Sequence, residues 1–258
     1  MLDWEQLFLF ELVAMRMTGF VLFNPLWGRN TVPGLVKAGF VLVLSVFTFG
    51  VAGEPQVEVP GNLIVLSLLL LLELGVGLTL SMVMRLFFSV VQIGGEIIDT
   101  QMGITMAQIY DASTQSNMTV TASLLNILLV LDFFAENGHY TLMRILVTSG
   151  ELLPYGTVSF GQEVASHVVE IFLACMVLAI KLALPILAAE LLGEIGMGIL
   201  MKAIPQINAF VINMELKVMI GLVLLFLFLT PIHEFLLGVE AQMLDQMSQT
   251  LGVIASGG

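Results

Sequence analysis

The chain has 258 residues, of which 58% are hydrophobic and only 11% charged, and its mean hydropathy is +1.03. Soluble domains carry about 25% charged residues, so this composition excludes a soluble globular protein. It indicates an all-α polytopic membrane protein with about six to seven long helices in a single helical domain over residues 1–258. The net charge of −12 comes without any basic cluster, so we interpret it as a solvated acidic rim and expect no nucleic-acid partner.

Six apolar segments follow one another along the chain. They cover residues 7–23, 38–51, 63–93, 119–134, 164–192 and 218–237. The first predicts a retained helix rather than a signal peptide, because Glu11 and Arg16 interrupt its apolar run and no small-residue cleavage site follows. The third is too long for one helix perpendicular to the bilayer, so it must tilt strongly, bend at Gly75 and Gly77, or project beyond the membrane.

Two weaker patterns concern orientation and packing. Arg29 and Lys37 flank the first turn, which predicts a cytoplasmic turn and an outer N-terminus by the positive-inside rule. Small residues spaced four apart predict close helix packing. These pairs are Gly77 with Ser81, Ala179 with Ala183, and Ala189 with Gly193.

Five ionisable residues fall within apolar segments. They are Glu11, Arg16, Glu73, Glu170 and Lys181. Each costs about 2.5–3.5 kcal/mol at the centre of a bilayer, so we expect them to face protein, water or each other. Glu170 and Lys181 are 11 residues apart and share one helix face, but they are too distant to pair, which predicts partners on other helices. Either polar contacts between helices or a transport pathway would account for these charges.

Enzymatic chemistry finds little support in the sequence. The three histidines are scattered, and the His-Glu of "PIHEFLL" lacks the second histidine of a zinc-protease helix. No Gly-rich phosphate loop is present, and the single cysteine, Cys175, excludes an intrachain disulfide. We therefore expect no catalytic residues, no cofactor and no metal site.

The segment from Gly94 to Thr119, "GGEIIDTQMGITMAQIYDASTQSNMT", combines three carboxylates with regularly placed aliphatic side chains. A lipid-facing helix cannot tolerate those carboxylates, whereas irregular backbone at membrane depth is tolerated where protein buries it or water lines it. Glycines at 94, 95 and 103 permit bends and close backbone approach. We predict that this segment lines a pore, with Met102 and Met106 as a deformable seal.

Several ordered motifs resemble the FliR family of type III secretion export-gate subunits, which includes the injectisome counterparts. They are "RMTGFVLFNPLWGRNTVPGLVKAG", "GGEIIDTQMGITMAQIYD", "ENGHYTLMRILVTSGELLP" and "LALPILAAELLGEIGMGILMKAIPQINAFVINMELKVMIGL". The resemblance covers nearly the whole chain. The residues that carry the family motif or its interfaces are Gly94, Glu96, Asp99, Gln101, Gly103, Pro205, Gln206, Asn208 and Lys217. Two departures are Ala112, where the family pattern has proline, and Lys202, where it has arginine.

The resemblance implies a non-enzymatic subunit of tilted helical hairpins in a multi-subunit ring with FliP and FliQ, with FlhB as a further partner. Such a ring surrounds a closed channel for unfolded flagellar proteins in the bacterial inner membrane, within the flagellar basal body and in contact with membrane lipid. Its pore plug would be the stretch Tyr110, Asp111, Ala112, Ser113, Thr114, Gln115, Ser116 and Asn117.

Two alternatives remain open. One is a stand-alone secondary transporter, favoured by possible helix breaks at Pro185 and Pro205, and the other is an assembly scaffold that never touches cargo.

Overall fold

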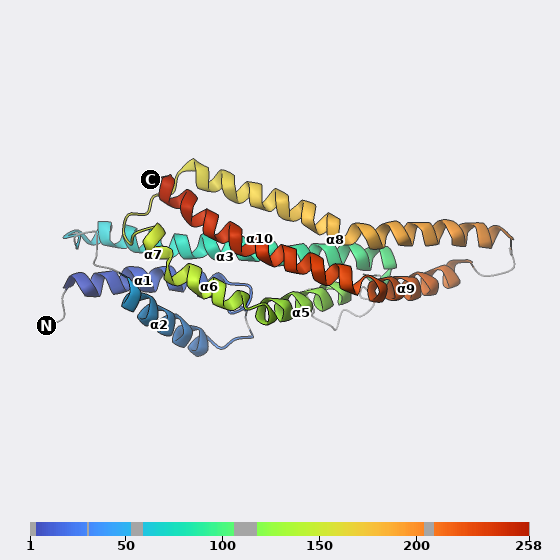
Figure 1. Ribbon diagram of the computed structural model, residues 1–258, viewed down its shortest axis with the longest axis horizontal. Coiled ribbons are helices and arrows are strands. Elements are labelled where there is room, and N and C mark those ends of the chain that lie inside the picture. The colour runs from blue at the N-terminus through green and yellow to red at the C-terminus, as the bar shows by residue number, and fades with distance from the viewer. Residues whose placement is uncertain (1–3, 30, 53–58, 106–117, 204–208, 258) are drawn as a thin grey trace. The chain divides into compact units, whose positions relative to one another are not determined.

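The computed structural model describes residues 4–29, 31–52, 59–105, 118–203 and 209–257, and these residues form helices without any strand (Figure 1). The helices are α1 (Trp4–Phe23), α2 (Gly34–Val51), α3 (Leu63–Met102), α5 (Val120–Ala135), α6 (Gly138–Val147), α7 (Ser149–Leu152), α8 (Gln162–Ala203), α9 (Ala209–Leu227) and α10 (Leu229–Ser256). In the described part of the chain, 4 helices are long and apolar enough to cross a membrane, or up to 6 if the broken pairs α5–α6 and α9–α10 each form one span. The predicted polytopic helical membrane protein is confirmed.

The two longest helices extend beyond the apolar segments that predict them. α3 has 40 residues and continues through Gly94 and Gly95, so these glycines do not interrupt the helix. A helix of that length measures about 60 Å, twice the roughly 30 Å of the hydrocarbon core, so it must tilt strongly or project from the membrane. α8 has 42 residues and continues through Pro185 to Ala203.

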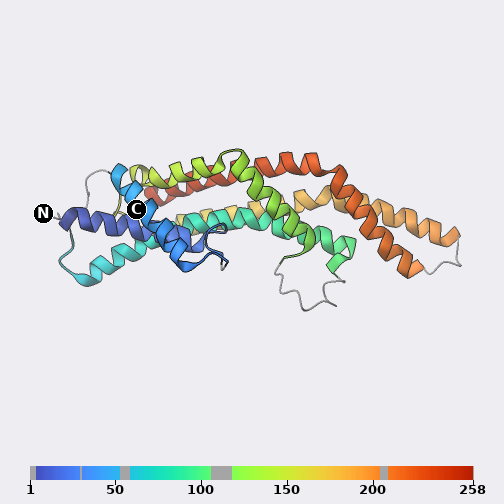
Figure 2. The ribbon, with the colours of Figure 1, turned by 90° about the horizontal axis from the view of Figure 1, so that it is seen from below.

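The predicted span over residues 218–237 falls on two helices joined by a break, which can together form one broken span. α9 ends at Leu227, α10 begins at Leu229, and the two helices are bent by 63° at this break (Figure 2). Pro231 explains the position, because it has no N–H to donate to the carbonyl of Leu227 and its ring clashes with that carbonyl. α10 then continues to Ser256, well past the predicted end.

The chain folds into two compact units. Unit 1 comprises Met1–Phe87, Asn137–Leu173 and Ala241–Gly258, and unit 2 comprises Phe88–Glu136 and Ala174–Glu240. Helices α3, α8 and α10 each contribute residues to both units. The grouping of all residues into one export-gate domain stays a prediction.

Close backbone contact between α1 and α3 organises unit 1. A Cβ atom on Gly19 would overlap the carbonyl oxygen of Leu74, and one on Gly77 would overlap the carbonyl oxygen of Arg16. Glycine is therefore the only residue that permits this approach at either position. The pair of small residues Gly77 and Ser81, spaced four apart, predicts close helix packing here. Gly77 makes that close contact, and Ser81 is buried.

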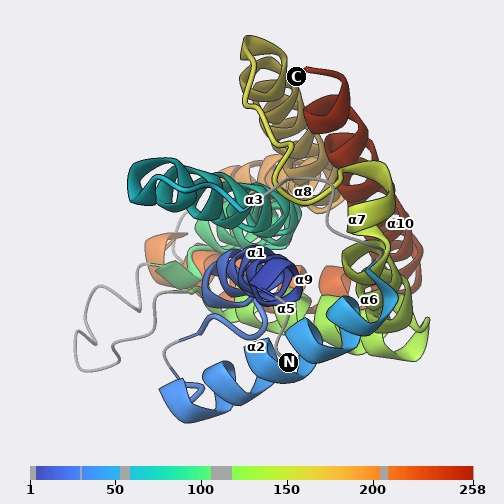
Figure 3. The same cartoon turned by 90° about the vertical axis from the view of Figure 1, so that its left-hand side faces the viewer.

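In unit 1, α1 lies between α2 and the first part of α3 (Figure 3). Aromatic contacts join α1 and the turn after it to α2: the ring centroids of Phe10 and Phe49 are 5.7 Å apart, and those of Trp27 and Phe40 are 5.0 Å apart. α2 nevertheless exposes most of its apolar surface. Its buried residues are Leu44, Ser45 and Thr48. Lipid or a partner protein must cover the rest, because so much apolar area is not left in water.

Unit 2 has its own close contacts around the second part of α3. A Cβ atom on Gly95 would overlap the backbone of Ala122 in α5. One on Gly94 would lie 2.8 Å from a methyl group of Leu182 and 3.2 Å from the carbonyl oxygen of Ala179, both in α8. Ala179 is fully buried. These glycines act by close approach to α5 and α8, which is one of their two predicted roles.

Candidate functional site

Asp99 joins the end of α3 to the start of α5 in unit 2. Its side chain is fully buried. One carboxylate oxygen accepts a hydrogen bond of 2.7 Å from the backbone N–H of Thr121, and the other accepts one from the Thr121 hydroxyl. Thr119, the N-cap residue of α5, supplies no side-chain cap. Asp99 therefore caps α5 from a distant position in the chain, where a negative charge also complements the helix dipole. We call this contact the Asp99–Thr121 clasp.

Residues next to the clasp are also well fixed. α3 ends at Met102, whose side chain is fully buried. Met102 packs against α9 so closely that a Cβ atom on Gly221 would lie 2.5 Å from it. Gly103 follows with a φ of 79°, a left-handed conformation that favours glycine. α3 therefore ends at a defined turn, and the pore-sealing role of Met102 stays a prediction.

Several predicted site residues lie outside the described residues. These are Met106, the predicted plug at 110–117, and the motif residues Pro205, Gln206 and Asn208. Of the other motif residues, Glu96 is exposed and Gln101 is half-buried on α3. Lys217 of α9 forms an ion pair with Glu194 of α8, and both side chains are partly buried. Lys217 thus links the two helices that flank the Pro-Gln-x-Asn motif.

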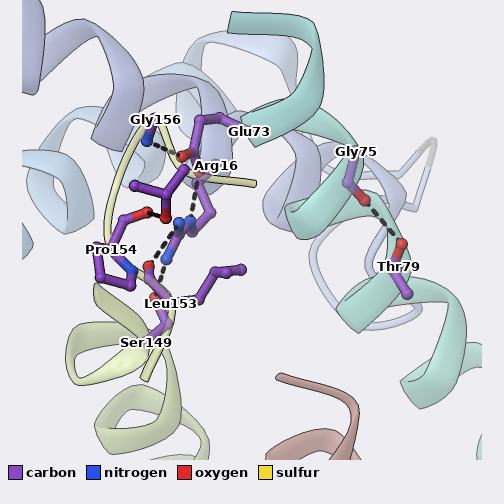
Figure 4. Close-up of polar contacts among 9 residues, drawn as sticks. Arg16, Glu73, Gly75, Thr79, Ser149, Leu153, Pro154 and Gly156 are labelled. Carbon is purple, nitrogen blue, oxygen red and sulfur yellow. Dashed lines mark hydrogen bonds and ion pairs between the residues drawn. The ribbon is translucent and has the colours of Figure 1, made fainter. Parts of the chain in front are cut away.

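A buried ion pair holds unit 1 together at Arg16 (Figure 4). The Nε atom of Arg16 donates a hydrogen bond of 2.7 Å to Glu73, and neither side chain exposes any surface. The two terminal nitrogens donate to the hydroxyl of Ser149 at 3.0 Å and to the carbonyl oxygen of Leu153 at 3.1 Å. The guanidinium carbon also lies 4.1 Å from the centroid of the Tyr155 ring, in cation–π geometry. We call these five residues the Arg16 cluster.

Glu73 is satisfied at both oxygens. Its second carboxylate oxygen accepts a hydrogen bond of 2.8 Å from the backbone N–H of Gly156 (Figure 4). Burial raises the pKa of the Tyr155 phenol above its ordinary value of 10.0, against a smaller lowering by Arg16, so the ring is neutral at physiological pH. α1, α3 and the segment 149–156 therefore meet at one polar centre. The sequence singles out Arg16 and Glu73 but neither pairs them nor points to that segment.

The remaining intramembrane charges behave differently. Glu11 of α1, Glu170 of α8 and Lys181 of α8 are exposed, and none has a hydrogen bond or ion pair with another described residue. No described residue of this chain is a partner of Glu170 or Lys181, so their partners on other helices stay a prediction. A charged group within an apolar helix needs water or protein around it, so these positions mark surfaces that require covering.

These observations define a polytopic helical membrane protein whose buried polar groups hold helices together. Over the residues that the structure describes, no group of three or more His, Cys, Asp or Glu side chains could hold a metal ion. A family model described as bacterial export proteins, family 1, matches residues 7–243. The chain belongs to this family of bacterial export proteins.

Individual relatives agree with the family match. The chain is 26% identical over 249 residues to the flagellar biosynthetic protein FliR of Bacillus subtilis, covering 95% of both chains. It is 28% identical over 225 residues to FliR of Escherichia coli, covering 87% of this chain and 84% of the relative. It is also 27% identical over 225 residues to the Yop proteins translocation protein T of Yersinia pestis, covering 85% of each. The family that the sequence motifs predict is therefore confirmed.

Proposed function

We propose that this chain is a core, non-enzymatic subunit of the flagellar type III secretion export gate in the bacterial inner membrane, within the flagellar basal body. The observation that carries the proposal is the family match over residues 7–243, together with FliR relatives along most of the chain. The subunit helps to form and plug the channel through which unfolded flagellar proteins leave the cytoplasm.

The proposed partners are FliP and FliQ in a hetero-oligomeric ring, with FlhB as a further subunit and lipid around the rim. The exposed surface of the chain supports such an assembly. α2 buries few of its residues, and Glu11 and Lys181 lie on apolar helices without a partner among the described residues. Neighbouring subunits would supply polar partners for these charges and would cover apolar surface that lipid does not.

The proposed plug is the stretch 110–117, and the Asp99–Thr121 clasp supports this assignment. The clasp joins two residues that are 22 positions apart in the chain. The two ends of the intervening chain are therefore held at one place in unit 2. A polar segment tethered at both ends can occupy a channel without being carried along by cargo.

Deleting residues 111–116 tests the plug directly. We expect the assembled complex to leak ions or small solutes across the membrane, because the polar obstruction is gone while the clasp and the helices remain. Deleting the six residues 53–58 from the Pro/Gly-rich turn is a control of equal length, and it should leave the membrane tight. Normal assembly with unchanged leakage after the first deletion would contradict the plug role.

Purification in mild detergent separates the gate from a stand-alone transporter. A gate subunit should co-purify with other small membrane proteins and should aggregate or degrade without them, because its exposed charges and α2 lack cover. A transporter should be monodisperse alone, and that result would overturn the proposed assembly.

A further inference from the structure

Unit 2 contains a buried carboxyl group whose oxygens lack partners. Glu190 of α8 is 2% exposed, and neither of its carboxylate oxygens has a hydrogen-bond partner among the described residues. α9 closes over this group, because one carboxylate oxygen lies only 2.6 Å from where a Cβ atom on Gly221 would stand. The side chain of Met102 lies 2.5 Å from that same position. Glu190 is therefore enclosed by a glycine backbone and a thioether.

The charged groups around Glu190 are already committed to other partners. Glu194 lies one helical turn further along α8, and Lys217 lies one turn before Gly221 on α9. Lys217 forms an ion pair with Glu194. On α3, Asp99 lies one turn before Met102 but accepts two hydrogen bonds from Thr121. Lys217 therefore lies close enough to act on Glu190 electrostatically, but no described residue donates a hydrogen bond to its carboxylate.

A small cavity connects this group to the ion pair. It has a volume of about 10 Å³. Its lining is Glu190, Gly193, Glu194, Met197, Lys217 and Ile220. A polar cavity must hold roughly 10–15 Å³ to admit one water molecule, so this one is at the lower limit for a single water. Because Glu190 is part of the lining, a water in this cavity would lie next to its carboxyl group.

We propose that Glu190 is a proton-binding site, at which the carboxylate takes a proton from hydronium and is held in the folded protein as a neutral carboxylic acid. An isolated carboxylate in an apolar interior is strongly disfavoured, and such a group neutralises instead. A donor from a neighbouring subunit is no substitute, because Glu190 has almost no accessible surface. The neutral acid also leaves Lys217 free to pair with Glu194, since a charged Glu190 would compete for the same ammonium group.

The inference rests on contacts within unit 2 and does not require the export role. Infrared spectroscopy tests it on the full-length protein, purified in the complex that it forms and exchanged into heavy water at neutral pH. A protonated carboxyl group has a C=O stretching band that is well separated from the carboxylate bands, with or without a hydrogen bond to water. We expect this band in the wild type, its loss in Glu190→Gln, and its retention in the control Glu194→Gln.

Two outcomes would overturn the proposal: absence of the band from the wild type, or its persistence unchanged in Glu190→Gln. If Glu190→Gln does not assemble, Glu190→Met replaces the acid by an apolar side chain of similar length and should also lose the band. Assembly of these neutral variants at wild-type yield is a second expected result. A large loss of complex in both variants would show that the group acts as a charged carboxylate and would contradict proton binding.

Discussion

Replacing Glu73 by leucine should destabilise unit 1 strongly. The variant removes the 2.7 Å hydrogen bond from Arg16 and the 2.8 Å hydrogen bond from the N–H of Gly156. Arg16 keeps Ser149 and the carbonyl of Leu153, but its charge loses the buried carboxylate that balances it. Breaking one side of a buried ion pair costs about 3–5 kcal/mol, which is a large part of the 5–15 kcal/mol that typically stabilises a domain. The folding equilibrium should fall by at least about a hundredfold.

The double variant Arg16→Met with Glu73→Leu decides whether charge imbalance is the cause. Replacing both partners of a buried pair by apolar residues is often neutral or stabilising, so the double variant should recover most of the lost stability. The assay is the temperature at which half of the detergent-solubilised complex disappears from its size-exclusion peak. Glu5→Leu, at an exposed acid on α1, is the control. A double variant as unstable as Glu73→Leu, or a single variant as stable as the wild type, would refute this reasoning.

Two further variants test the helix contacts by the same thermal assay. Asp99→Ala should lower the free energy of unfolding by about 1–3 kcal/mol, because the N–H and hydroxyl of Thr121 lose their acceptor. The control Glu96→Ala, at an exposed position on the same helix, should change it by no more than about 0.5 kcal/mol. Equal effects of the two variants would contradict the Asp99–Thr121 clasp. Gly77→Ala should cost about 1–3 kcal/mol, because its methyl group overlaps the α1 backbone. The control Gly39→Ala has no atom within 4 Å of the added carbon, so it should be neutral or stabilising by about 0.4–1 kcal/mol. A Gly77→Ala variant as stable as the wild type would exclude the close approach of α1 to α3.

Hydropathy predicts where helices lie but not where they end. Each of the six apolar segments coincides with helical structure. However, α3 continues through Glu96 and Asp99, two acidic residues that interrupt the apolar pattern and would suggest that the helix ends before them. Asp99 is tolerated because Thr121 satisfies it, and that partner lies on another helix. Pro231 accounts for the break between α9 and α10, but a proline alone does not predict a break, because α8 continues through Pro185.

The polar contacts were harder to predict than the helices. The free-energy cost of a charge in lipid predicts that Arg16 and Glu73 need polar partners. In the structure both residues have such partners. Their pairing depends on the register of α1 against α3, which glycines at 19 and 77 set through backbone contact. Arg16 and Glu73 are 57 positions apart in the chain, so no helical periodicity in the sequence connects them. The segment 149–156 contributes mainly backbone groups and one hydroxyl, which leave no compositional signal.

The most direct test of the export-gate account is site-specific photo-crosslinking from position 113. Ser113 lies in the proposed plug, and Phe47 on α2, which is 67% exposed, is the control position. In cells with an export substrate stalled in the channel, the photoreactive residue at 113 should cross-link to that substrate and the one at 47 should not. A fully assembled complex in which position 113 never reaches the stalled substrate would contradict the account.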